Sequence, residues 1–203
     1  MEIQRINVYT DTRFSKKALK QHGCFAIGDD LFEFEIISDH EAVITGDNRE
    51  YYDDLIEEFQ FYAPHISTFY DSDRAIVKKF DRPEILKIAL EDIQPSQFYV
   101  DRSKIDAISS FVEKKEDIII QVIRHDDRYI SLDGHTRLYY AVMKGFTQVR
   151  AVMAESSAYI YDFVAEAQRR GIYSPHDLIP LEHDEYDILW HKYCDDYFAN
   201  REG

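Results

Sequence analysis

The sequence predicts an α/β or α+β fold, because short apolar strand patterns are interspersed with amphipathic helical patterns along the whole chain. The chain has 203 residues, which fits one domain or two small ones. The pattern changes after Asp81-Arg82-Pro83, which is therefore the best candidate for a boundary. We expect an α+β segment of unknown role over residues 1–82, a second domain over 83–153 and a helical extension over 154–203.

The N-terminal segment should contain two strand pairs and one helix. Residues 31–37 and 42–44 alternate enough to predict a hairpin. Apolar residues three or four apart predict one buried helix face over 50–62. Residues 65–70 and 75–80 predict a second pair of strands. The pyrophosphate-binding turn of acetyltransferases has no counterpart here, so we exclude that class.

Beyond the boundary, strands and helices alternate. The expected strands span 85–90, 117–123, 129–132 and 149–153, with a loop at 94–97 and helices over 102–113, 135–144 and 157–170. A last helix should begin near His183. Its expected inward residues are Tyr186, Leu189, Trp190, Tyr193 and Tyr197.

The formal net charge of −15 argues against broad binding to nucleic acid or to an anionic membrane surface. Cys24 and Cys194 form no motif with metal-ligand or redox spacing. The start of the chain lacks the apolar run of a signal peptide, and no stretch has the apolar length of a membrane span. We expect a cytoplasmic protein that contacts neither DNA nor a membrane.

The segment Asp133-Gly134-His135-Thr136-Arg137 joins an apolar strand directly to a helix. A helix start exposes backbone N–H groups and carries partial positive charge. Gly134 has no Cβ and would allow a ligand close to the backbone. His135, Thr136 and Arg137 add donors for a phosphate. The prediction requires that the amides are uncovered and that Arg137 is not used in an internal carboxylate pair.

Asp133 is the unusual member of this loop, because a carboxylate repels phosphate. Its presence is explained if it binds a metal ion such as Mg²⁺, accepts a substrate or ribose hydroxyl, or acts as a base. We therefore name Asp133 and His135 as candidate catalytic residues. The structural alternative is an Asp-Gly turn in which Asp133 caps the helix and the neighbouring side chains are solvated.

The loop and its flanks resemble the ParB/sulfiredoxin superfamily. The matching pieces are ILKIALEDIQPSQFYV, which is loosely similar, and DIIIQVIRHDDRYISLDGHTRLYYAVMKGFTQVRAVM, which is similar throughout. Members have a strand that ends in a G-x-x-R or D-G-H-x-R loop, followed by a helix and a short strand. The resemblance covers about a third of the chain and implies a ParB/sulfiredoxin-like core.

The branches of this superfamily imply different chemistries. Sulfiredoxins carry a cysteine where this chain has His135, which argues against sulfinic-acid reduction. ParB proteins bind CTP but also need a basic DNA-binding domain. Free-serine kinases of this fold carry D-G-H-H-R, which differs only at Thr136. The resemblance thus implies ATP, ADP or CTP with Mg²⁺ at the loop, with Gln94, Ser96 and Gln97 facing it.

One departure bears on catalysis. Those kinases place a glutamate just after the first strand, where this chain has Pro95-Ser96-Gln97. An amide such as Gln97 cannot act as a general base, and Glu91 or Asp92 would have to substitute. The leading hypothesis is a nucleotide-binding protein, with small-molecule kinase or nucleotide hydrolase activity as its catalytic form.

The other hypothesis is a non-catalytic regulatory module. It would keep the fold and act through its acidic, aromatic C-terminal helices on a protein partner or a second copy. His183, Asp187 and His191 lie four residues apart on the last of these helices. We interpret them as an acidic solvated face rather than a metal site.

Overall fold

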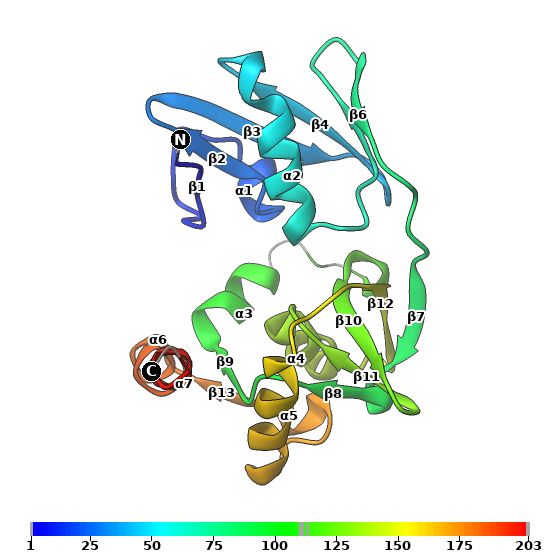
Figure 1. Cartoon of the computed structure of the whole chain (residues 1–203), viewed down its shortest axis with the longest axis vertical. Helices are drawn as coiled ribbons and strands as arrows, with labels where there is room; N and C mark the ends of the chain where they lie inside the picture. The colour runs from blue at the N-terminus through cyan, green and yellow to red at the C-terminus, as the bar shows by residue number, and fades with distance from the viewer. Residues whose placement is uncertain (1, 110–111, 113, 202–203) are drawn as a thin grey trace. The chain divides into compact units, whose positions relative to one another are not determined.

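The computed structural model describes residues 2–109, 112 and 114–201. The chain divides into two compact units, Met1–Glu84 and Ile85–Gly203. Each unit contains its own sheet and its own helices, so the fold is α+β (Figure 1).

The first unit is built on a six-stranded sheet with the strands in chain order. All neighbours are antiparallel except β4 and β5, which the helix α2 connects as a parallel pair. The strands are β1 (Gln4–Arg5), β2 (Cys24–Ile27), β3 (Asp30–Ile36), β4 (Glu41–Gly46), β5 (Thr68–Tyr70) and β6 (Ile76–Lys79). The helices are α1 (Lys16–Lys20), a 3-10 turn (Arg49–Tyr51) and α2 (Tyr52–Tyr62).

The helix α2 supplies the main core of this unit. Its buried side chains pack on the inward residues of the sheet, and the rings of Phe59 and Phe34 stack with centroids 4.3 Å apart. The predicted hairpin, helix and later strands are confirmed. The strands β1 and β2 and the helix α1 were not predicted, because the four consecutive buried residues of β2 give no alternation.

The second unit is built on a mixed five-stranded sheet of order β7-β12-β10-β11-β8. The pairs β10–β12 and β11–β8 are parallel, and β10–β11 and β12–β7 are antiparallel. The strands are β7 (Leu86–Ala89), β8 (Ile93–Pro95), β10 (Ile119–His125), β11 (Arg128–Ser131) and β12 (Gln148–Met153). A separate parallel pair consists of β9 (Tyr99–Asp101) and β13 (Ile179–Leu181).

Helices surround this sheet and share one large apolar core with it. They are α3 (Arg102–Ser109), α4 (His135–Met143), α5 (Tyr159–Arg169), α6 (His183–Tyr186) and α7 (Lys192–Ala199). Three 3-10 turns lie in the connections β7–β8 (Leu90–Asp92), α3–β10 (Lys115–Asp117) and α5–β13 (Pro175–Asp177). The expected helix end of 102–113 lies partly outside the described residues.

Two local predictions in this unit were wrong. Gln94 and Pro95 lie in the strand β8 rather than in a loop. Leu189 is 47% exposed rather than inward. The segment Asp187–His191 between α6 and α7 is a π-helical turn, whose wider repeat changes the phase of the helix and turns Trp190 toward Phe98 instead.

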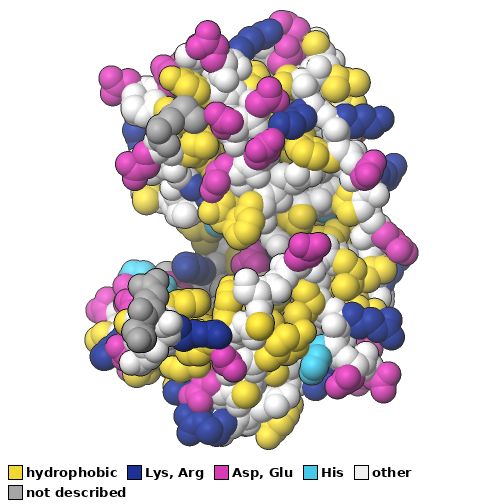
Figure 2. Space-filling view, in the orientation of Figure 1, with side chains coloured by type: hydrophobic (Ala, Val, Ile, Leu, Met, Phe, Trp, Pro, Cys, Tyr) yellow, Lys and Arg dark blue, Asp and Glu magenta, His cyan; other side chains and the backbone are white. Residues whose placement is uncertain are grey.

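The surface carries both signs of charge. Figure 2 shows Asp and Glu side chains interspersed with Lys and Arg on the visible face of each unit. None of the helices in the described part of the chain combines the length and apolar character that crossing a bilayer requires.

Candidate functional site

The predicted loop lies where the strand β11 passes into the helix α4. The amide of Leu132 still donates to the Gln121 carbonyl of β10, so the sheet holds the chain up to that residue. Gly134 follows as the N-cap with φ of 80° and ψ of 20°. The helix then begins at His135, where the first N–H groups have no partner within the helix.

Gly134 is required for a different reason than ligand approach. A Cβ at this position would lie 2.6 Å from Ile120 Cγ2 and 3.2 Å from two guanidinium nitrogens of Arg137. Its positive φ also disfavours other residues. The expectation that the missing Cβ leaves room for a ligand was therefore wrong, since Ile120 and Arg137 fill that space.

Arg137 is engaged within the protein. Its Nη1 donates to the Ile119 carbonyl at 2.6 Å, and its Nη2 donates to Asp133 Oδ2 at 2.8 Å. The Arg137 side chain is 29% exposed and that of Asp133 is 58% exposed. Arg137 is therefore paired with a carboxylate of the protein, but this carboxylate is exposed in the same loop and does not lie in the interior. A phosphate that used Nη2 would first have to displace Asp133.

His135 points into the interior and is only 6% exposed. Its Nε2 lies within hydrogen-bond distance of two hydroxyls, 3.1 Å from Ser131 Oγ and 3.3 Å from Ser96 Oγ. Ser96 Oγ in turn donates to the Ser131 carbonyl at 2.7 Å. Burial lowers the pKa of His135 to about 4, so its ring is neutral near pH 7. Its predicted phosphate and catalytic roles are not supported by this position, because the ring links α4 to Ser131 of β11 and to Ser96, the residue after β8.

Two of the three residues expected to face the loop from β8 and its end face elsewhere. Gln94 is buried and donates to the Pro95 and Ile172 carbonyls. Gln97 donates to the Tyr99 carbonyl and, at 3.0 Å, to Tyr186 Oη of the C-terminal helix. Ser96 alone of these three contacts a loop residue.

Asp133 is exposed and Thr136 is half-buried at the surface of the loop. Asp133 gives one carboxylate for Mg²⁺, but Arg137 already uses it. Within residues 2–109, 112 and 114–201, no group of three His, Cys, Asp or Glu side chains is placed to hold a metal ion. A metal at this loop would therefore depend on ligands from a bound phosphate.

A second polar cluster was not predicted. The buried carboxylate of Asp101 accepts from His183 Nδ1 at 2.8 Å, and from the amide and hydroxyl of Ser103. His183 was interpreted as part of an acidic solvated face, and its side chain is 58% exposed and 3.6 Å from Asp187, but its contact with the buried Asp101 was not predicted. No sequence signal could have found this pair, because the two residues are 82 positions apart and only the pairing of β9 with β13 brings them together.

No family model matches the chain, and no curated protein sequence matches it. Among solved structures, the chain is similar to protein Atu1540 from Agrobacterium tumefaciens, with 17% sequence identity and a TM-score of 0.36. The similarity covers 50% of this chain and 64% of Atu1540. A likeness at this level carries no argument about the fold or the function.

Proposed function

We propose that the second unit is a ParB/sulfiredoxin-like domain that binds the phosphate groups of a nucleotide at residues 133–137 without transferring them. One observation carries the proposal. In the first turn of α4, the Arg137 guanidinium already holds an oxyanion, the partly exposed carboxylate of Asp133, at 2.8 Å. Phosphate oxygens, like those of that carboxylate, are negatively charged and accept hydrogen bonds.

The binding step would exchange one anion for another. The guanidinium stays oriented by the Ile119 carbonyl, while Asp133 turns outward and the phosphate takes its place. The amides that open α4 would supply further donors. Because the exchange breaks an ion pair, we expect modest affinity rather than the tight binding of a preformed pocket.

The absence of turnover in this proposal follows from the candidate catalytic groups. His135 is neutral and held in the interior, so it meets neither a substrate hydroxyl nor a transferring phosphate. Gln97 cannot accept a proton as a general base and is held by Tyr186. The kinase and hydrolase forms of the hypothesis therefore depend on groups that the geometry of the loop does not favour.

Calorimetric titration of the full chain with ATP, ADP and CTP, each with and without Mg²⁺, tests the proposal. We expect binding with dissociation constants in the micromolar to millimolar range and no release of ADP or phosphate. Arg137→Met should abolish the heat of binding, whereas Arg124→Met, a change at an exposed residue of β10, should leave it intact. Absence of binding by all three nucleotides would reject the proposal.

A second candidate function is docking of a protein partner on the C-terminal helices. Ile188, Leu189 and Phe198 are 64%, 47% and 43% exposed on these helices. Exposed apolar side chains that form one contiguous patch mark interaction surfaces, whereas scattered ones are ordinary, so the proposal requires that these residues act together. Sedimentation of wild-type protein against Ile188→Glu would detect self-association through this segment, which is one form of this function.

A further inference from the structure

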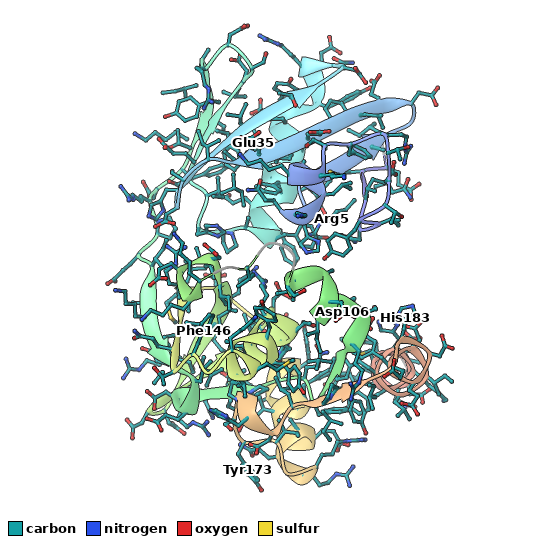
Figure 3. All side chains as sticks on the ribbon, turned by 180° about the vertical axis from the view of Figure 1, so that it is seen from behind. Arg5, Glu35, Asp106, Phe146, Tyr173 and His183 are labelled. Atoms are coloured by element: carbon teal, nitrogen blue, oxygen red, sulfur yellow. The ribbon has the colours of Figure 1, made fainter. Side chains whose placement is uncertain are left out.

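The helices α6 and α7 and the π-helical turn between them form one C-terminal helix. Its first turn contacts the rest of the second unit. His183 is the first residue of α6, and its Nδ1 donates to Asp101 Oδ2 at 2.8 Å. Figure 3 labels His183 beside the C-terminal helices. One turn later, Tyr186 is 5% exposed and its hydroxyl accepts from Gln97. Arg102 and Glu182 form an exposed ion pair beside them.

We infer that His183 and Asp101 form a charge-dependent latch, which holds the C-terminal helix most firmly when His183 is protonated and loosens as the ring loses that proton at higher pH. The latch is a property of the second unit and does not depend on nucleotide binding at the loop.

Asp101 is buried whereas His183 is exposed, and this difference makes the latch sensitive to the charge on His183. The Asp101 side chain is 1% exposed, while that of His183 is 58% exposed. Burial opposes the charge on Asp101, but the hydrogen bonds from Ser103 and His183 outweigh it and keep its pKa below the usual value. The carboxylate therefore stays ionised, and a buried anion gains most from a cationic partner.

The other carboxylates near His183 also favour its protonated form. On its own helix, Asp187 Oδ2 lies 3.6 Å from His183 Nε2, and Asp184 is also close. The hydrogen bond to Asp101 is the largest cause, and Asp187 the next, of a His183 pKa above the usual value.

The remaining charges near the latch are already paired or turned elsewhere. From α3, Arg102 pairs with Glu182, and Lys104 lies over the Tyr186 ring. On the same helix, His191 pairs with Asp187 at 3.1 Å and so competes with His183 for that carboxylate. The strand β13 contributes only Ile179, Pro180 and Leu181, which carry no charge.

The direction of the pH effect follows from these contacts. A histidine whose pKa is raised by docking stabilises the docked state fully at pH values below its free pKa. This stabilisation is lost as the pH rises through the docked pKa. The neutral ring can still donate from Nδ1, so the helix loosens rather than leaves. Each unit of displacement in the pKa corresponds to about a tenfold change in the docking equilibrium.

The chain contains its own reporter of docking. Trp190 is its one tryptophan, and its ring lies 4.9 Å from Phe98 and 5.9 Å from Phe163, measured between centroids. Loosening of the C-terminal helix should expose this indole to water. Acrylamide quenching of its fluorescence in the full chain therefore measures how well the helix is docked.

The experiment compares quenching at pH 6.0 and pH 8.5. Wild-type protein should be quenched several-fold more strongly at pH 8.5. In His183→Asn, whose amide can replace the Nδ1 donor without a charge, quenching should not change with pH. Asp187→Asn should reduce the pH effect in part. His176→Asn removes an exposed histidine elsewhere in the unit and should behave as wild type.

Two results would overturn the latch. One is equal quenching of the wild-type protein at both pH values. The other is an undiminished pH effect in His183→Asn. Titration of the His183 ring by NMR guards against a misfolded variant, since Asp101→Asn should lower its midpoint if the pair is formed. An unchanged midpoint would also reject the inference.

Discussion

The guanidinium of Arg137 donates to two acceptors, the carbonyl of the buried residue Ile119 at 2.6 Å and the exposed carboxylate of Asp133 at 2.8 Å. The first contact fixes the side chain against β10. The second places an anion of the protein at the outer edge of the guanidinium, where a ligand anion would bind. In the proposed site, Asp133 therefore competes with phosphate and weakens its binding. A catalytic or metal-binding carboxylate would instead promote ligand binding or turnover.

The first prediction concerns Asp133→Asn. Removal of the competing carboxylate should strengthen nucleotide binding about two- to fivefold, because an exposed ion pair contributes about 0.5–1 kcal/mol. Calorimetric titration with ATP measures the change. Asp127→Asn, which removes an exposed charge from the turn after β10, should alter binding much less. Weaker binding in Asp133→Asn, above all with Mg²⁺ present, would instead favour a metal ligand or a catalytic carboxylate.

The second prediction separates the two contacts of Arg137. Arg137→Met should abolish nucleotide binding and should also destabilise the second unit by about 1–2 kcal/mol, because the Ile119 carbonyl loses a charged donor. Arg137→Lys keeps the charge but cannot form both bonds in the same geometry. It should regain part of the affinity and little of the stability. Urea unfolding followed by Trp190 fluorescence gives the stability of this unit.

The outcome that contradicts this prediction is a stable Arg137→Met protein with wild-type affinity. Such a result would show that the guanidinium contacts are incidental, and the phosphate would have to be held by the backbone of α4 alone.

The third prediction concerns the glycine of the loop. Gly134→Ala should destabilise the second unit by more than about 2 kcal/mol, since it adds a 2.6 Å approach to Ile120 Cγ2 to the cost of a positive φ. Gly171→Ala is the matched control, because Gly171 has a φ of 84° but nothing within 4 Å of the added Cβ. That change should cost only about 1 kcal/mol. Equal losses in the two variants would mean that Ile120 moves aside freely.

Periodicity and turn chemistry were sufficient to predict most of the second unit. The strand before the loop, the helix after it and the closing strand 148–153 all lie within a few residues of their expected places. These elements are regular and local, and glycine marks the ends of α4 and α5. The strands β9 and β13 were missed, because each has three residues and each is stabilised by a partner about 80 positions away.

The candidate site was harder to predict than the fold. The loop residues are adjacent in sequence, so their proximity was certain, but their orientation depends on contacts from other strands. The Ile119 carbonyl captures Arg137, and the Ser96 and Ser131 hydroxyls capture His135. These hydrogen bonds form only in the folded tertiary structure. The residue types alone do not tell whether a side chain binds a ligand or a neighbouring residue.

The last prediction uses the buried histidine. Because burial lowers the pKa of His135 to about 4, the folded protein binds its proton less readily than the unfolded chain does. Between pH 6.5 and pH 4 the unfolded state therefore binds more protons, and the stability of the second unit falls as the pH decreases through this window. A displacement of this size corresponds to a loss on the order of 3 kcal/mol at the acid end.

Urea unfolding at pH 7.0, 5.5 and 4.5, followed by Trp190 fluorescence, measures this loss. His135→Gln cannot be protonated and should flatten the acid limb, although it should be less stable than wild type at pH 7.0 because the amide does not reproduce the packing and the hydroxyl contacts of the buried ring. The His183–Asp101 latch acts in the opposite sense over part of this range, so the double variant with His183→Asn should isolate the His135 effect. A persistent acid limb in His135→Gln would assign the loss to other groups, such as carboxylates whose pKa the fold lowers, and not to His135.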